Sequence, residues 1–181
     1  MKRRGLTLIE VLLTMSLFSM VLLAIYFIYT QTMVVQRKTG AQNQAYRAVM
    51  LAMKHVEMQL RGSQLILPST WSPSLTPLTT VTYLYPTVQN GQIVVDVTGT
   101  PNWAGRAHFE LDGIGRFSKV DETNAADSRV LSNLGPNGRV SFWRSERDLL
   151  RLRVYAEIAD DFGRTTSNYE FETLLRLSNQ P

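Results

Sequence analysis

Glu10 is the first residue of the chain whose surroundings require a chemical explanation. It is the one charged residue in residues 6–29, a run of 24 that is mostly apolar. A charged side chain at the centre of a bilayer costs about 2.5–3.5 kcal/mol on insertion scales. In a helix, Glu10 lies roughly 6 Å past Leu6, near the edge of the bilayer, where the cost is smaller. An ionisable group in such a run indicates a function that involves its charge.

Three positive charges and a glycine precede this run. The charges are those of Lys2, Arg3 and Arg4. Gly5 follows them directly. A helix formed by the apolar run would be about 36 Å long, enough to cross a hydrocarbon core of about 30 Å. Basic residues before such a span keep that end in the cytoplasm, so we expect a single-pass helix with the rest of the chain outside the inner membrane.

Two simpler interpretations explain less of this segment. A cleaved signal peptide has an apolar region of about 7–15 residues followed by small residues at the cut site. The apolar run is longer, and no such site follows it. A plain signal anchor accounts for the hydrophobicity but gives no reason for Glu10.

The string KRRGLTLIEVLL resembles the class III signal of type IV prepilins and pseudopilins. That family has a short basic leader ending in Gly, then an apolar first mature residue, then Glu at a fixed distance. The resemblance implies that residues 1–5 are a leader and that prepilin peptidase cleaves between Gly5 and Leu6. It further implies that Leu6 becomes an N-methylated amino terminus, although Phe or Met is more usual at that position.

The resemblance also suggests a partner for the Glu10 carboxylate. Leu6 and Glu10 lie four residues apart, on one face of a helix. An apolar filament core penalises an unpaired carboxylate. We expect the Leu6 amine of a neighbouring subunit to neutralise Glu10 and to fix the axial register between subunits. A pair within one chain, with no role between subunits, is the alternative.

Nothing in the sequence forces the N-terminal helix to end before about Arg61. No Pro occurs before Pro68, and Gly40 is the one interior Gly. We predict a transmembrane and filament-core helix over residues 6–30, continued by an amphipathic helix over residues 31–62. In this second part, apolar residues recur at spacings of three and four. They are Ala45, Val49, Ala52, Met53, Val56 and Leu60.

Residues 63–181 predict a β-rich head. Residues 65–80 hold three of the seven prolines and indicate a linker. Turn signals between β-rich runs predict three hairpins, at residues 81–97, 106–120 and 128–144. Alternating apolar residues in residues 149–158 and 168–177 predict strands with one buried face. The expected fold class is therefore α+β: a long N-terminal helix packed by its amphipathic half on a pilin-like antiparallel β-sheet head of about seven or eight strands.

The head lacks recognisable catalytic motifs, so we expect no enzyme and no cofactor. The chain has no Cys, which excludes disulfides and thiolate chemistry. His55 and His108 have no acidic or His neighbour at metal-binding spacing, and we expect ordinary structural or surface roles for them. Calcium takes six to eight oxygen ligands. Only the pairs at residues 121–122 and 160–161 suggest it, and we interpret both as solvated turns.

The net charge of +4 gives little support for nucleic-acid binding. Without the three leader charges, 16 basic residues face 15 acidic ones. The best local cluster comprises Arg144, Arg147, Arg151 and Arg153, beside Trp143. Acidic residues lie close to it, so we expect a solvated face. A DNA-binding competence pilin stays open as an alternative, as does a signal-anchored extracytoplasmic enzyme or binding module.

Within the family, the absence of Cys and the large head favour a minor pilin or minor pseudopilin, with a loose similarity to J-type and W-type subunits. The resemblance implies a part in a type IV pilus, a type II secretion pseudopilus or a DNA-uptake filament. Expected partners are the inner membrane, prepilin peptidase, other pilin or pseudopilin subunits and the assembly platform. The subunit would end in a cell-surface pilus or a periplasmic pseudopilus.

Overall fold

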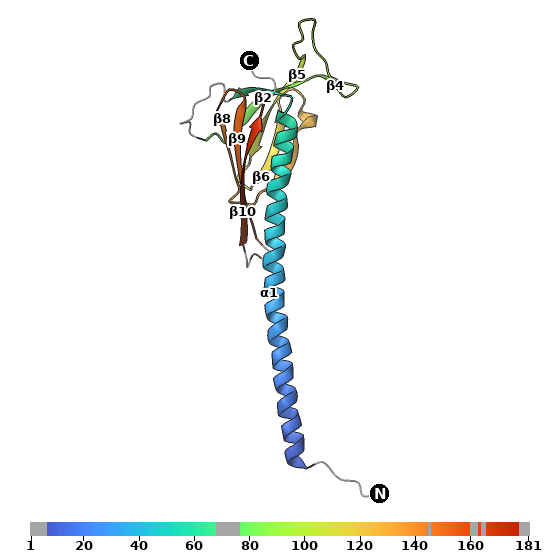
Figure 1. Cartoon of the computed structure of the whole chain (residues 1–181), viewed down its shortest axis with the longest axis vertical. Coiled ribbons are helices and arrows are strands. Elements are labelled where there is room, and N and C mark those ends of the chain that lie inside the picture. Colours follow the sequence, from blue (N-terminus) through green and yellow to red (C-terminus); the bar gives the residue numbers. More distant parts are fainter. Residues whose placement is uncertain (1–6, 68–76, 145, 160–162, 164–165, 178–181) are drawn as a thin grey trace.

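The computed structural model describes residues 7–67, 77–144, 146–159, 163 and 166–177. Its first element is α1, Leu8–Leu60, a single helix of 53 residues that continues through Gly40. In Figure 1 the N-terminal half of α1 projects away from the head, and only the C-terminal half lies against it. The prediction of one long helix reaching about Arg61 is confirmed.

The C-terminal half of α1 packs on the head through a stripe of mostly small side chains. The buried residues recur at intervals of three and four, which places them on one face of the helix. Four are alanines, and small side chains let the helix approach the sheets closely. The buried residues of α1 are Ala41, Ala45, Ala48, Val49, Ala52, Met53, Val56 and Leu60.

The described residues of the head form two main antiparallel sheets and one small hairpin. One sheet has the order β1-β2-β5-β6-β7, and the other has the order β10-β9-β8. The first comprises Gln64–Leu67, Val81–Pro86, Trp103–Leu111, Arg116–Asp121 and Arg129–Asn133. The second comprises β8 (Arg139–Arg144), β9 (Leu149–Ala159) and β10 (Thr166–Arg176). The hairpin pairs β3 (Val88–Gln89) with β4 (Gln92–Ile93), and a short 3-10 helix spans Ala125–Asp127.

The predicted hairpin at residues 128–144 is wrong, because its two strands belong to different sheets. β7 pairs with β6, and β8 pairs with β9. Between them, the Leu134 amide donates to the Gly115 carbonyl at 2.8 Å and its carbonyl accepts from the Glu157 amide at 2.9 Å. Gly115 and Gly135 both have positive φ, and a Cβ on either would overlap a neighbouring backbone carbonyl. The chain therefore crosses between the sheets here instead of turning back.

The other strand predictions need smaller corrections. The hairpin at residues 106–120 is confirmed by the pairing of β5 with β6. The turn at Asn90 and Gly91 exists, with φ of 52° and 77°, but its ladder is only two residues long on each side. β2 pairs with β5 instead. The described residues include ten strands, because β1 overlaps the start of the predicted linker and the predicted hairpin at residues 81–97 contains three strands instead of two.

The core lies between α1 and the two sheets. Aromatic rings of Tyr83, Phe109 and Phe117 stack in sequence, with centroids 5.1 and 5.6 Å apart. Phe142 joins the two sheets, since its ring stacks on Phe109 at 6.3 Å. The buried Ser132 hydroxyl donates to the Ala48 carbonyl at 2.7 Å and fastens β7 to α1. The α+β prediction, with the amphipathic half of the helix on an antiparallel head, is confirmed.

Candidate functional site

The N-terminal half of α1 is apolar on every side, and no other described part of the chain packs against it. Every residue from 7 to 29 is exposed. Leu8 is 81% exposed and Phe18 65%, values that are extreme for large apolar residues. By length and composition, this is the one helix of the described residues that could cross a membrane. Large exposed apolar surfaces mark contacts with membranes or proteins.

Several hydroxyl groups in this half are satisfied within the helix. The Thr14 hydroxyl lies 3.0 Å from the Glu10 carbonyl and 2.9 Å from the Val11 carbonyl. The Ser19 hydroxyl donates to the Met15 carbonyl at 2.8 Å. Thr30 and Thr32 bond back to their own turns in the same way. Such bonds suit a helix in an apolar medium, where no water is present to replace them.

Glu10 differs from these residues, because its carboxylate has no hydrogen bond or ion pair within the described part of the chain. It lies in the first turn of α1, where its amide donates to the Thr7 carbonyl at 3.0 Å. Thr7 occupies the N-cap position, but its side chain makes no capping bond. The positive end of the helix dipole favours a carboxylate at this place by about 0.3–1 kcal/mol. An external cation could therefore reach Glu10.

The predicted leader and cleavage site lie outside the described residues. This applies to Lys2, Arg3 and Arg4, and to Gly5 and Leu6. The cleavage between Gly5 and Leu6, the methylation of Leu6 and its pairing with Glu10 therefore remain predictions.

The two histidines have different surroundings. The His108 ring lies 2.8 Å from the Glu122 carboxylate, which also pairs with Arg106 at 2.9 Å. His55 is half-buried on α1, and its Nδ1 has no hydrogen-bond partner. Within the described ranges, no group of three His, Cys, Asp or Glu side chains could hold a metal ion.

Asp121 does not belong to the solvated turn that the sequence suggested, whereas Glu122 follows it in an exposed bend. Asp121 is buried and pairs with Lys119 at 3.1 Å. Its carboxylate also accepts from the Tyr85 hydroxyl at 3.1 Å and the Asn124 amide at 2.9 Å. Burial alone would raise the pKa of Asp121, but these hydrogen bonds lower it below its usual range. The pair at residues 160–161 lies outside the described residues.

The arginine cluster is held by the head's own groups. Arg144 is buried, not solvated as predicted, and donates to the Arg147 carbonyl at 2.8 Å; burial lowers its pKa. Arg151 and Arg153 are exposed, as expected, and both pair with Glu172. Arg153 also pairs with Glu170 at 3.3 Å, so two carboxylates compensate the two positive charges.

Sequence reasoning missed an open groove between α1 and β10. Phe171 and Leu175 lie on the same face of the strand predicted over residues 168–177, yet Phe171 is 41% exposed, because α1 leaves it uncovered. The sequence did offer a signal for this groove. Tyr46 and Leu51 are apolar residues of α1 that lie off the stripe that packs on the head, and both are exposed.

One comparison with known proteins identifies the N-terminal segment. Residues 1–26 match the family model described as the prokaryotic N-terminal methylation motif. That motif is the class III prepilin signal, and it includes Gly5, Leu6 and Glu10. No curated protein and no solved structure matches the chain.

Proposed function

We propose that this chain, which carries the class III prepilin signal on a pilin-like α+β fold, is a structural subunit of a type IV pilin-like filament and not an enzyme. One observation carries the proposal: the apolar half of α1, which includes most of the methylation motif, is exposed on all sides. Such a helix needs a cover from outside its own chain. A membrane supplies it before assembly, and the helices of other subunits supply it afterwards.

The proposal assigns the N-terminal residues successive roles. Lys2, Arg3 and Arg4 hold the leader in the cytoplasm while the helix spans the inner membrane and the head lies outside. Prepilin peptidase cleaves after Gly5 and removes the three charges. The new amino terminus at Leu6 is methylated and neutralises Glu10 of a neighbouring subunit, which sets the register.

At finer detail, we propose a minor pilin or minor pseudopilin of a type IV pilus, a type II secretion pseudopilus or a DNA-uptake filament. The absence of Cys and the large head favour a minor over a major subunit. The subunit would act with the assembly platform and other subunits and would end in a surface pilus or a periplasmic pseudopilus.

Substitution of Glu10 tests this proposal. Glu10→Ala should leave membrane insertion intact, because it removes the one charge from the apolar run. It should strongly impair incorporation into filaments, because the neighbouring amine loses its counter-ion. The measurement compares the amount of subunit in the membrane fraction with that in sheared or purified filaments. Normal incorporation of Glu10→Ala would contradict the register role.

A further inference from the structure

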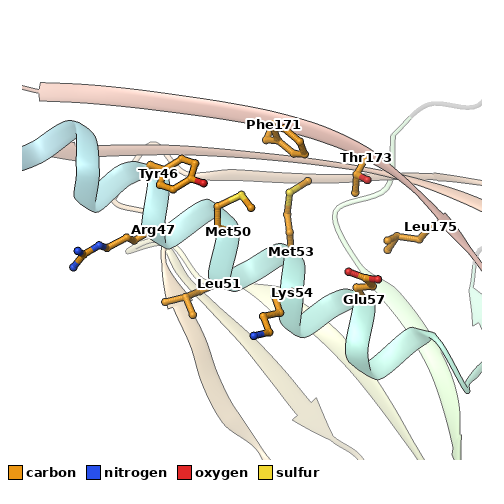
Figure 2. A pocket seen from close by; sticks show the side chains of 10 residues that line it. All are labelled: Tyr46, Arg47, Met50, Leu51, Met53, Lys54, Glu57, Phe171, Thr173 and Leu175. Atoms are coloured by element: carbon orange, nitrogen blue, oxygen red, sulfur yellow. The ribbon is translucent and has the colours of Figure 1, made fainter. Parts of the chain in front are cut away.

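A groove of about 670 Å³ lies between the outer side of α1 and the edge of the three-stranded sheet. Figure 2 shows Phe171 and Thr173 on β10 facing the methionines of α1 across it. A contiguous exposed apolar surface of this kind marks an interaction site. The apolar residues of the lining are Tyr46, Met50, Leu51, Met53, Phe171 and Leu175.

A second exposed apolar surface lies on a projecting arm, which we define as residues 87–102. The arm connects β2 to β5 and includes the small hairpin of β3 and β4. In Figure 1 it extends beyond the C-terminal end of α1, at the end of the molecule away from the apolar half of the helix. Its exposed aliphatic residues are Val88, Ile93, Val95 and Val97.

The arm is held in shape by its own hydrogen bonds. At its base, the Thr87 amide donates to the Asn102 carbonyl at 2.7 Å. At its tip, the Asp96 amide donates to the Thr100 carbonyl at 2.9 Å. The Asp96 carboxylate accepts from the Thr98 and Thr100 amides at 2.8 and 2.9 Å. An exposed tip that is already ordered loses little conformational entropy when it binds a partner.

We propose that the tip of this arm inserts end-on into the groove of a second copy of this chain. Val97 lies in the turn at the tip and is fully exposed. It would pack on Met50 and Leu51 of the second copy, and the unbranched Met side chain can adapt to the inserted tip. The contact would remove apolar side chains of both copies from water.

The rim of the groove carries positive charge on both sides of Leu51. Arg47 and Lys54 lie four residues before and three residues after Leu51, so both are its neighbours on the surface of α1. Both are exposed, and neither has an ion pair among the described residues. Glu57, the one acid of the lining, pairs with Arg61 at 2.6 Å. The rim therefore favours an acidic group on the occupant.

The arm supplies such a group beside its apolar tip. Asp96 is the one charged residue of the arm and directly precedes Val97. Hydrogen bonds from the Thr98 hydroxyl and the turn amides lower the pKa of Asp96, so its carboxylate is ionised at neutral pH. Because the rim charges flank Leu51, a Val97 side chain on Leu51 brings the carboxylate within reach of one of them.

The proposed contact joins different parts of the two copies. Each contact leaves one arm and one groove free, so it can repeat in an open chain of parallel copies. The arm lies beyond Leu60 and the groove lies around Leu51, so the second copy is displaced along the helix by more than about 14 Å. Copies anchored in one membrane are level. The contact would therefore form as subunits leave the membrane for the filament, a point that rests on the proposed function.

Disulfide cross-linking of the detergent-solubilised full chain tests this inference. The chain has no Cys, so each introduced thiol is unique. A Val97→Cys chain and a Leu51→Cys chain with different affinity tags are mixed and oxidised with copper phenanthroline. We expect a disulfide-linked dimer that carries both tags.

Met58→Cys provides the matched control, because it places a thiol on the same helix outside the groove lining. With Val97→Cys it should give at least about tenfold less mixed dimer than Leu51→Cys does, since the contact raises the effective thiol concentration at the groove alone. All three residues are exposed, so the substitutions leave the core intact. Absence of the mixed dimer, or equal yields from Leu51→Cys and Met58→Cys, would overturn the inference.

A charge variant tests the placement of the tip. Asp96→Asn keeps a side-chain oxygen that can accept from the turn amides but removes the negative charge. Added to the Val97→Cys chain, it should lower the yield of mixed dimer by about threefold or more at low salt. An unchanged yield would overturn the pairing of Asp96 with the rim. A failed cross-link in a protein that natively starts at Leu6 would refute this contact and leave the proposed function standing.

Discussion

The two halves of α1 differ in where their apolar side chains are covered. Residues 8–29 expose every side chain, including those of Leu23 and Phe27. The buried residues of the helix all lie between Ala41 and Leu60, against the two sheets of the same chain. Figure 1 shows the same division, since the head reaches only part of the way along the helix.

This contrast indicates that one half of α1 stabilises the folded monomer and that the other half is available for assembly. The burial that stabilises the monomer comes from the second half of α1, whose stripe completes the core of the head. The first half contributes no buried residue to the core of the monomer, so much of its hydrophobic free energy is available for a membrane or for other subunits. Matched substitutions in the two regions should therefore have different effects on head stability.

Replacement of a phenylalanine by alanine should give the largest difference in head stability between the two regions. Phe109 is fully buried and stacks on three aromatic rings. Phe109→Ala should lower the free energy of unfolding of the head by about 3–5 kcal/mol. Phe18→Ala, in the exposed half, should change it by less than about 0.5 kcal/mol. Chemical denaturation in detergent, followed by tryptophan fluorescence, measures both. Equal losses would mean that the first half of α1 is part of the monomer's fold.

Replacement of an alanine by leucine should also destabilise the head more in the buried region than in the exposed region, but by a smaller amount. Ala45 is completely buried against the head, whereas Ala24 is exposed. Ala45→Leu should destabilise the head by about 1–3 kcal/mol, because the added atoms overpack the interface. Ala24→Leu should leave the unfolding transition unchanged and improve membrane partitioning slightly. The contrast fails if the midpoint of unfolding shifts equally in the two variants.

A carboxylate has different surroundings in the two regions, and this difference predicts how the stability of the head depends on pH. Glu10 has no partner among the described residues, whereas Asp121 is held by its own chain through Lys119 and Tyr85. The folded-state pKa of Asp121 is lowered, so its ionised form stabilises the head above the unfolded value of about 3.9. That contribution is lost as the pH falls through the folded-state pKa.

Asp121→Asn should accordingly cost about 1 kcal/mol at neutral pH and progressively less toward pH 3. Unfolding curves recorded across this range check the prediction. A constant difference at all pH values would show that the effect does not come from the ionised carboxylate.

Local patterns predicted the helix and the hairpin at residues 106–120, because both depend on neighbours in the chain. The partition into two sheets was not predictable in this way. It depends on the backbone contact of Leu134 with Gly115 and Glu157, which are distant in sequence. Residues 128–144 have the turn residues and β-rich runs that are typical of a hairpin. The tertiary contact nevertheless places the two strands in different sheets.

The candidate site shows the same limit. Glu10 could be selected from the sequence, because one charge in an apolar run is visible without a fold. The groove beside β10 could not, because periodicity indicates which face of a strand points inward and not how far a helix covers that face. Phe171 is the clearest case, since it follows the alternation yet remains exposed.

The mass and N-terminal sequence of the native protein test the central claim most directly. The claim is that the exposed half of α1 begins a processed subunit. It predicts that protein isolated from its own cells lacks residues 1–5 and starts at an N-methylated Leu6. A native chain that retains Lys2, Arg3 and Arg4 together with Gly5 would contradict the account.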